Sequence, residues 1–352
     1  MIWWVFSFAL LGLILWIAFR RTSIGELESD PDSIASYEEA LARVKAMQEG
    51  DSNDLTRDVC ITKLYDHGNS TEHVIILIHG FTNCPEQFNE LGKQYYEAGY
   101  NVFIPRLPYH GLSDRMTGEL VNLTAENLAV FGDQVIDISH GLGEKITVMG
   151  ISGSGTLVAW LAQNRADIDF AIAIAPLFGL AFVPPSLTKL FERIGLLLPN
   201  FFLWWDPRTK ADNPYSIYYA YPRYPTRALM EIIRLGMITR SQAEKSPPRT
   251  QNITLIINDA EPAVSNAETL KLLRRWQKHK RSSPVDRRSS PVDQRSTPRS
   301  GSVDARGNLS EIHFEKDLKL PHDIITPGTP GVPVEITHPR LIGAVRELHI
   351  KK

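Results

Sequence analysis

The chain has 352 residues, a hydrophobic content of 43% and a formal net charge of −2. This length suffices for one large α/β domain with an inserted segment, and the hydrophobic content indicates a globular core. The small net charge gives no strong electrostatic attraction to nucleic acid, so no nucleic-acid partner is expected. The sequence has no His or Cys group with zinc-site spacing and no phosphate-binding glycine loop, so we predict neither a metal nor a cofactor.

The N-terminal stretch from Ile2 to Phe19 has no charged residue and is rich in Leu, Ile, Phe and Trp. As a helix it would span roughly 27 Å, close to the hydrocarbon thickness of a bilayer. We therefore predict a single transmembrane anchor over residues 1 to 21. A cleaved signal peptide is the alternative, but no basic segment precedes the apolar run. Arg20 and Arg21 follow the span, and the positive-inside tendency favours a cytoplasmic domain.

Residues 22 to 54 are acidic and polar, with a short helical pattern around Tyr37 to Met47, and we interpret them as a stalk or linker. The two cysteines of the chain are Cys60 and Cys84. They have neither the density of a disulfide scaffold nor the spacing of a metal site. Both are therefore expected to be free, buried thiols.

The first strong strand signal is the continuous apolar run from Val74 to His79, which is typical of a central parallel strand covered on both faces. Pro85 to Ala98 reads as a helix, with proline in its opening turn. Tyr100 to Pro105 is the next predicted strand, and Thr124 to Ser139 the next helix. His79, and His110 in a later loop, are expected to be structural histidines.

Ile146 to Met149 is an apolar, partly β-branched run that predicts a buried strand, and a glycine-dense turn follows it. Ser152 lies in this turn, before a predicted helix from Leu157 to Asn164. A hydroxyl at such a corner can stand clear of the sheet, and the helix N-terminus offers N–H groups to a developing oxyanion. Ser152 is the candidate nucleophile and Ser154 its rival. A turn that merely joins strand and helix is the alternative.

Asp169 to Ala175 is a further buried strand, so strands and helices alternate up to this point. This alternation predicts a mainly parallel sheet with helices on both faces. From residue 177 to residue 248 the alternation stops, and aromatic residues and prolines become frequent. We interpret this segment as an inserted helical cap over the site. The core domain would then comprise residues 55 to 176 and 249 to 352.

Two acids follow the next predicted strand, Ile253 to Ile257, and these are Asp259 and Glu261. Glu311 to Glu315 is the last predicted strand, and His322 lies in the loop beyond it. A carboxylate and an imidazole that each follow a strand can meet a serine at the same edge of a parallel sheet. An acid-rich surface turn is the alternative interpretation of both carboxylates.

Residues 278 to 308 form a separate compositional unit with a near-repeat, Arg281-Ser-Ser-Pro-Val-Asp286 and Arg288-Ser-Ser-Pro-Val-Asp293. It has too few apolar residues to offset the entropy of ordering, so we predict a disordered surface loop within the core domain. Its basic start could touch anionic lipid headgroups, although a solvated loop without a partner is the preferred interpretation.

Two of these motifs resemble elements of the α/β-hydrolase family. Gly150-x-Ser152-x-Ser154 resembles its nucleophile elbow, with Ser154 where the family usually has glycine. His79-Gly80-Phe81-Thr82 resembles the loop that supplies half of its oxyanion hole. The chain order of Ser152, Glu261 and His322 is also the order of the family's catalytic triad.

The resemblance implies an α/β-hydrolase fold and a serine hydrolase that works through an acyl-enzyme without a cofactor or metal. It implies a base at His322, an acid at Glu261 with Asp259 as runner-up, and oxyanion donors at the N–H groups of Phe81 and Gly153.

The resemblance is closest to carboxylesterases and monoacylglycerol lipases, so the expected substrate is an apolar carboxylic ester such as a lipid ester. The alternatives are a peptidase or thioesterase on the same triad, and a membrane-tethered binding protein that has lost turnover.

Overall fold

The computed structural model of the protein describes residues 3–4, 12, 25–52, 55–208, 210, 217–281 and 308–350. Except at a few positions, the predicted anchor (1–21) and the predicted disordered loop (278–308) lie outside the described residues. In the part of the chain that is described, no helix combines the length and the apolar character needed to span a bilayer.

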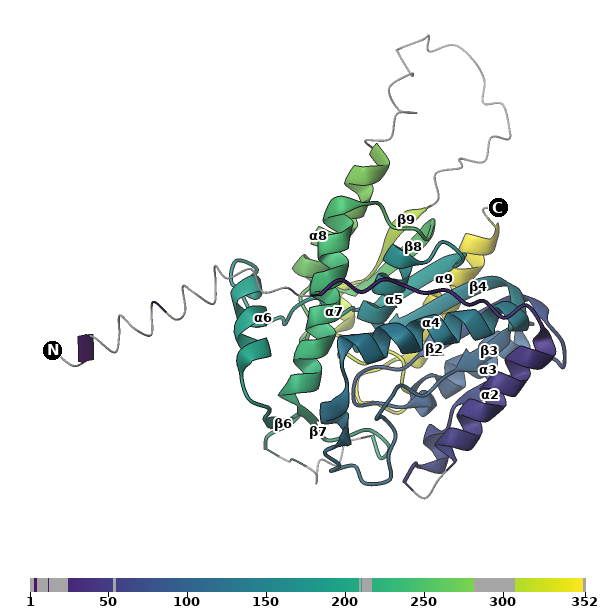
Figure 1. The fold of residues 1–352 in the computed structure, drawn as a ribbon, viewed down its shortest axis with the longest axis horizontal. Coiled ribbons are helices and arrows are strands. Elements are labelled where there is room, and N and C mark those ends of the chain that lie inside the picture. The colour runs from purple at the N-terminus through teal and green to yellow at the C-terminus, as the bar shows by residue number, and fades with distance from the viewer. Residues whose placement is uncertain are drawn as a thin grey trace, which may run out of the picture.

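A seven-stranded sheet lies at the centre of the molecule, in the spatial order β1-β3-β2-β4-β5-β8-β9 (Figure 1). All neighbouring strands pair in parallel except β1, which is antiparallel to β3. The predicted mainly parallel sheet is therefore confirmed, and its apolar inner strands are buried on both faces as that arrangement requires. The strands are β1 (Lys63–Tyr65), β2 (Thr71–Ile78), β3 (Asn101–Ile104), β4 (Gly143–Ile151), β5 (Phe170–Ile174), β8 (Asn252–Asn258) and β9 (Leu309–Phe314).

Helices cover the sheet in two layers (Figure 1). In one layer α4, α5, α7 and α8 pack successively against one another, and in the other α3 and α9 are joined by a hydrogen bond from the Tyr95 hydroxyl to the carbonyl of Leu341. A capping box at Thr124 fixes the start of α4. The helices are α3 (Asn89–Glu97), α4 (Ala125–Leu142), α5 (Gly153–Asn164), α7 (Thr226–Lys245), α8 (Asn266–Arg281) and α9 (Val334–Ile350).

Residues 25–52, which the sequence analysis treats as part of a stalk or linker, lie along the core domain. They contain α2 (Tyr37–Asp51), which begins after Ser36 and buries Ala40 and Val44 against α4. The two helices approach closely at Gly141, where a Cβ atom would lie 2.5 Å from the carbonyl oxygen of Ser36. A glycine is therefore needed at this contact.

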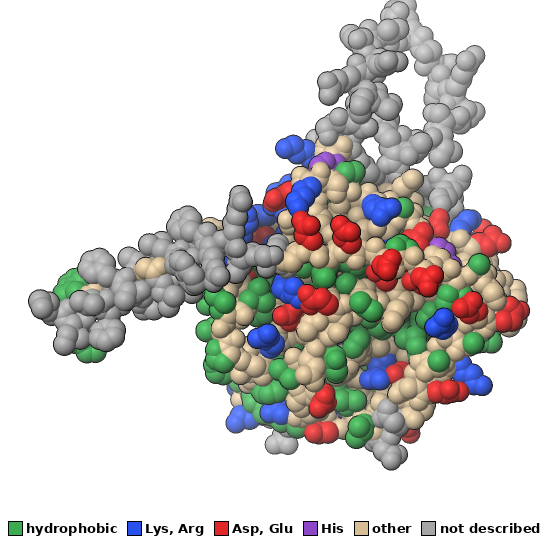
Figure 2. All heavy atoms as spheres, in the orientation of Figure 1, with side chains coloured by type: hydrophobic (Ala, Val, Ile, Leu, Met, Phe, Trp, Pro, Cys, Tyr) green, Lys and Arg blue, Asp and Glu red, His purple; other side chains and the backbone are tan. Residues whose placement is uncertain are grey.

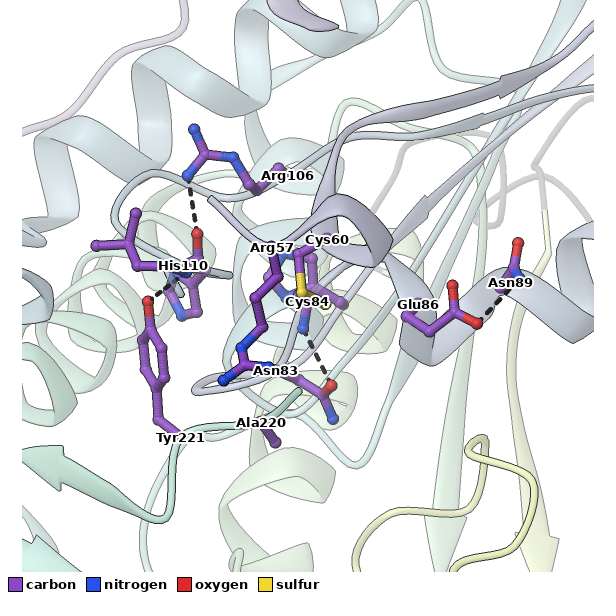
Figure 3. The surroundings of a disulfide bond; sticks show 12 residues. Arg57, Cys60, Asn83, Cys84, Glu86, Asn89, Arg106, His110, Ala220 and Tyr221 are labelled. Atoms are coloured by element: carbon purple, nitrogen blue, oxygen red, sulfur yellow. Dashed lines mark hydrogen bonds between the residues drawn. A yellow bond between two sulfur atoms is a disulfide. The ribbon is translucent and has the colours of Figure 1, made fainter. Parts of the chain in front are cut away.

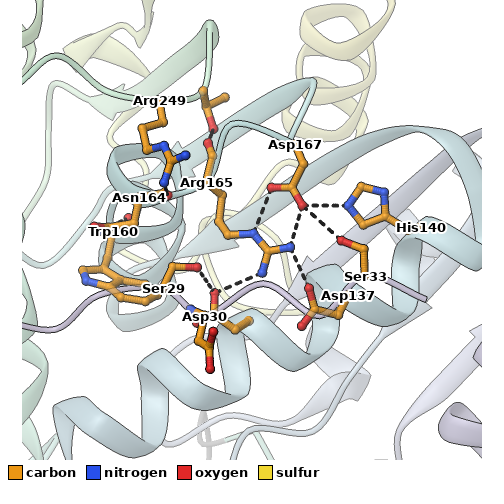
Figure 4. Close-up of polar contacts among 12 residues, drawn as sticks. Ser29, Asp30, Ser33, Asp137, His140, Trp160, Asn164, Arg165, Asp167 and Arg249 are labelled. Carbon is orange, nitrogen blue, oxygen red and sulfur yellow. Dashed lines mark hydrogen bonds and ion pairs between the residues drawn. The ribbon is translucent and has the colours of Figure 1, made fainter. Parts of the chain in front are cut away.

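Arg165 anchors the segment before α2 to the core (Figure 4). Its fully buried guanidinium pairs with Asp133, Asp137 and Asp167 at 3.1, 2.7 and 2.6 Å, and Asp133 also accepts a hydrogen bond from the Ser29 hydroxyl. Burial alone would raise the pKa of Asp167, but its hydrogen bonds to Arg165 lower that pKa well below the usual range. The carboxylates therefore compensate the buried cation, and Asp133 also holds the segment through its hydrogen bond from Ser29.

Charged side chains of both signs are intermixed on the face of the molecule seen in Figure 2. This pattern agrees with the small net charge of the chain. On that face neither sign gathers into one large patch.

The segment predicted as a cap contains α6 (Thr188–Leu197), the two-stranded sheet of β6 (Phe202–Trp204) and β7 (Arg223–Pro225), and α7. Of these, α7 packs directly on α5 of the core. The part before α7 carries many of the exposed large apolar side chains of the described chain, namely Phe182, Leu187, Leu197, Leu198, Phe201, Leu203 and Trp205.

Cys60 and Cys84 form a disulfide, so the expectation of two free thiols is wrong (Figure 3). Cys60 ends the short helix η1 (Asp58–Cys60), and Cys84 directly precedes the short helix η2 (Pro85–Phe88). The pairing results from the packing of η1 against η2, which no local spacing in the sequence reports. The bond fastens the loop after β2 to the segment before β1.

Replacing both Cys60 and Cys84 with serine is expected to lower the free energy of unfolding by about 2–4 kcal/mol, because the bond restricts the unfolded chain. Urea unfolding of wild type and variant measures the difference. Wild-type protein denatured without reductant should react with iodoacetamide at neither cysteine in mass spectrometry. Alkylation of both thiols under those conditions would contradict the disulfide.

Candidate active site

Ser152 occupies the corner between β4 and α5 in a backbone conformation, φ 59° and ψ −117°, that residues other than glycine rarely adopt. The surrounding backbone holds it there: its N–H donates to the carbonyl of Ile174 at 2.9 Å, and its carbonyl accepts from the N–H of Leu177 at 3.2 Å. A Cβ atom at Gly150 would lie 2.8 Å from the carbonyl oxygen of Ser154, so the tight turn needs glycine there. The strand-to-helix corner that the sequence predicts at Ser152 is therefore present.

Ser154, the rival nucleophile of the sequence analysis, is buried beneath the corner. Its hydroxyl donates to the carbonyl of Ile78 at 2.6 Å and accepts from the N–H of Ile151 at 3.0 Å. It therefore joins the ends of β2 and β4, and its proton is already engaged.

His322, in the loop after β9, is hydrogen-bonded through Nδ1 to Oε1 of Glu261 at 2.8 Å. The Glu261 side chain is only 1% exposed, and the same oxygen accepts from the N–H groups of Ala263 and Val264 at 2.8 and 3.2 Å. A carboxylate at Nδ1 favours the tautomer with its proton there, which leaves Nε2 as a hydrogen-bond acceptor. The structure thus brings two of the three predicted triad residues into direct contact.

Asp259, the runner-up acid, lies elsewhere. Its Oδ1 is 2.7 Å from Nδ1 of His313 in β9, and both side chains are 38% exposed. The two acids that follow β8 therefore have different histidine partners, and of the two it is Glu261 that is hydrogen-bonded to His322.

Ser152 and His322 line one cavity of about 280 Å³. Apolar and aromatic side chains from the core and the cap supply much of its wall, together with a few charged groups. The residues in that wall include Phe81, Ile151, Trp205, Ile217, Tyr221, Arg115 and Asp323.

The loop after β2 brings Phe81 beside the nucleophile corner: a Cβ atom at Gly153 would lie 3.3 Å from Cβ of Phe81. The cap holds this loop through Thr82, which has a positive φ of 66°. Its hydroxyl accepts a hydrogen bond from Nε1 of Trp205 at 2.9 Å, and its carbonyl accepts from the N–H of Tyr221 at 2.8 Å. The loop and the corner are therefore neighbours, and cap residues fix the loop's position.

His79 is fully buried and braces this loop. Its Nε2 accepts a hydrogen bond from the N–H of Leu107 at 3.1 Å, so Nδ1 carries the proton and donates to the carbonyl of Gly80 at 3.1 Å. Burial, with a contribution from His110, lowers the pKa of His79 well below its usual value. Burial likewise lowers the pKa of His110 to about 4. Both rings are therefore neutral near pH 7, and both are hydrogen-bonded to the backbone.

Three residues around the cavity were not singled out from the sequence: Gln87, Trp205 and Asp323. Trp205 belongs to an aromatic run whose composition predicts a cap but cannot identify which ring reaches the site. Asp323 directly follows His322, so its place in the sequence could have identified it as a residue near the site. Nothing local marks Gln87, because its contacts depend on how two distant loops meet.

A family model described as serine aminopeptidase, S33, matches residues 69–283, which is more than half of the chain. A thermostable monoacylglycerol lipase from Bacillus sp. (strain H-257) is 28% identical over 177 residues, which cover 49% of this chain and 64% of the lipase. The match therefore spans less than two thirds of that relative's length.

Solved structures of the same general fold include two lipases. The monoacylglycerol lipase of Paleococcus ferrophilus superimposes with a TM-score of 0.55 at 15% identity, covering 82% of this chain and 98% of that one. A soluble variant of the monoglyceride lipase from Saccharomyces cerevisiae gives a TM-score of 0.54 at 14% identity, covering 82% of this chain and 91% of that one. At these identities the likeness shows the fold.

Proposed function

We propose that this chain, which belongs to the family described as serine aminopeptidase, S33, is a serine hydrolase that cleaves apolar carboxylic esters. The observation that carries the proposal is the hydrogen bond between Glu261 and His322, with His322 and Ser152 in the wall of one cavity. Such an arrangement supplies what a serine nucleophile lacks near neutral pH, namely a base oriented by an acid.

The proposed reaction begins when Ser152 Oγ attacks the ester carbonyl carbon and His322 Nε2 takes the hydroxyl proton. Glu261 keeps the ring oriented and stabilises the imidazolium. The N–H groups of Phe81 and Gly153 hold the oxyanion of the tetrahedral intermediate. The intermediate collapses as His322 gives its proton to the departing alcohol, and water activated by the same histidine then releases the carboxylic acid from the acyl-enzyme.

Lipid esters, such as monoacylglycerols, are the proposed substrate class. The apolar wall of the cavity supports an acyl chain, because aromatic and aliphatic side chains there would bury it. The monoacylglycerol lipases to which the chain is similar support the same class. The family's description also names an aminopeptidase, so cleavage of a peptide-like amide is the second candidate.

We further propose that residues 1 to 21 anchor the protein in a membrane, where lipid esters are available. The exposed apolar side chains of the cap support a location near lipid. Arg20 and Arg21 favour the cytoplasmic side. The disulfide between Cys60 and Cys84 instead supports an oxidising compartment, because cytosolic thiols are kept reduced. We propose the oxidising side, because a stable disulfide points to an oxidising compartment, whereas two arginines give only a weak orientation signal.

Hydrolysis of p-nitrophenyl esters of several chain lengths tests the proposal, with aminoacyl p-nitroanilides as the competing substrates. Ser152→Ala should lower kcat/KM by at least about 10³-fold and abolish labelling by a fluorophosphonate, because the activated hydroxyl is lost. The matched control Ser154→Ala should keep the label, because its hydroxyl serves the backbone. Equal ester rates for wild type and Ser152→Ala would contradict the assignment, and faster cleavage of the anilides would favour the aminopeptidase.

The choice of acid is tested by two matched amide substitutions. Glu261→Gln should lower kcat by about 10³–10⁴-fold, because an amide neither fixes the working tautomer of His322 nor stabilises its charged form. Asp259→Asn should change kcat by less than about threefold, because surface substitutions away from a site have small effects. Steady-state kinetics on one ester measure both variants, and the reverse ranking would make Asp259 the acid.

A further inference from the structure

Gln87 lies between two loops whose relative position matters for the proposed mechanism. It is 3% exposed and belongs to the short helix η2, directly after the loop that contains Phe81. Its Oε1 accepts a hydrogen bond from the N–H of Gly80 at 2.8 Å, and its Nε2 donates to Oδ2 of Asp323 at 2.9 Å. One amide group thus contacts the loop after β2 and the loop after β9.

Asp323 organises the second of these loops. Its Oδ1 accepts from the N–H groups of Ile325 and Thr326 at 2.9 and 3.1 Å, and its Oδ2 accepts from the Thr326 hydroxyl at 2.6 Å. Because Asp323 directly follows His322, these bonds fix the turn that carries the imidazole. Asp323 therefore fixes the backbone beside His322, while Glu261 orients the ring.

The two loops come from strands that are far apart in the sheet. Strands β4, β5 and β8 lie between β2 and β9, so no backbone hydrogen bonds of the sheet join β2 to β9. The side-chain hydrogen bond between Gln87 and Asp323 spans this separation at the carboxyl edge of the sheet. A tie of this kind can set the distance between the backbone donor of Phe81 and the ring of His322.

We propose that Gln87 is a positioning residue that fixes the loop after β2, which contains Phe81, relative to the loop after β9, which contains His322. This inference rests on the hydrolase function proposed above. For this role the side chain at position 87 must carry two groups: an acceptor for the N–H of Gly80 and a donor to the carboxylate of Asp323. Glutamine supplies both at neutral pH. Glutamate has the same shape but no donor, and it would face Asp323 with a second negative charge.

Gln87→Glu is therefore the decisive substitution. Near pH 8 it should lower kcat about 100-fold while KM changes by less than about threefold, because small misplacements of reacting groups cost rate more than binding. As the pH falls, the introduced carboxylate and Asp323 should share one proton, since adjacent carboxylates raise each other's pKa. The shared proton re-forms the bridge, so the ratio of variant to wild-type kcat should rise.

Titratable groups common to both proteins do not account for such a rise, because an added negative charge favours protonation of the catalytic base and would lower the ratio as the pH falls. Near Asp323 these groups are the adjacent His322, Tyr219 of the cap and His338 of α9; Glu86 acts on Tyr219 and Glu90 on His338. Burial raises the pKa of Tyr219, which keeps it neutral, and burial lowers the pKa of His338, which favours its neutral form.

The double variant Gln87→Glu/Asp323→Asn provides the rescue. The introduced asparagine can donate to the introduced glutamate, while its oxygen still accepts from the turn, so the bridge returns with donor and acceptor exchanged. The kcat of the double variant should exceed that of Gln87→Glu by at least about tenfold near pH 8, with no rise in relative rate at lower pH.

Gln163→Glu is the matched control. Gln163 is also 3% exposed, lies at the far end of α5, and donates to the carbonyls of Ser246 and Pro247. This variant should lose stability but keep kcat, per site titrated with fluorophosphonate, within about twofold of wild type. A purely structural role for Gln87 would give the same result.

The proposal is overturned if Gln87→Glu keeps its kcat, if its loss matches that of Gln163→Glu, or if the double variant is no faster. Should Gln87→Glu fail to fold, the double variant decides, and near-wild-type kcat in it supports the bridge. An inactive wild type on every ester would overturn the proposed reaction instead. The same variants are then ranked by their rates of fluorophosphonate labelling at Ser152.

Discussion

The hydrogen bond between Glu261 and His322 depends on one constraint, the parallel pairing of strands β4, β5, β8 and β9. Parallel strands place their carboxyl ends at the same edge of a sheet, so residues far apart in the chain can meet there. Ser152 follows β4, Glu261 follows β8 and His322 follows β9. Had one of these strands run antiparallel, its following loop would lie at the opposite edge.

Neighbouring structure stabilises the loops in which these residues lie. The backbone of Ser152 has a conformation that costs free energy, and hydrogen bonds from the adjoining strand and loop hold it. The loop of Phe81 is tied on one side by the disulfide at Cys84 and on the other by Trp205 and the cap. These contacts hold both loops in fixed positions, and fixed donors would cost no reorganisation during a reaction of the proposed kind.

Local sequence patterns predicted β2, β3, β4, β5, β8 and β9, the corner of Ser152 and the loop of His322, because each rests on residues adjacent in the chain. The short strands β1, β6 and β7 were not predicted. The order of strand, turn and helix around Ser152 is such a pattern, and the parallel sheet follows from its repetition. The disulfide of Cys60 and Cys84 was missed because it depends on two short helices packing together. Gln87 was missed for the same reason, since its partners Gly80 and Asp323 are brought together by the tertiary fold alone.

The central claim is that a covalent intermediate forms on Ser152 with its oxyanion held by the loop after β2. The most direct measurement is a crystal structure of the adduct formed with a p-nitrophenyl alkylphosphonate, which mimics the tetrahedral intermediate. We predict phosphorus bonded to Ser152 Oγ, and a phosphonyl oxygen within hydrogen-bond distance of the N–H groups of Phe81 and Gly153. An adduct on another residue, or a phosphonyl oxygen directed away from both N–H groups, would contradict the claim.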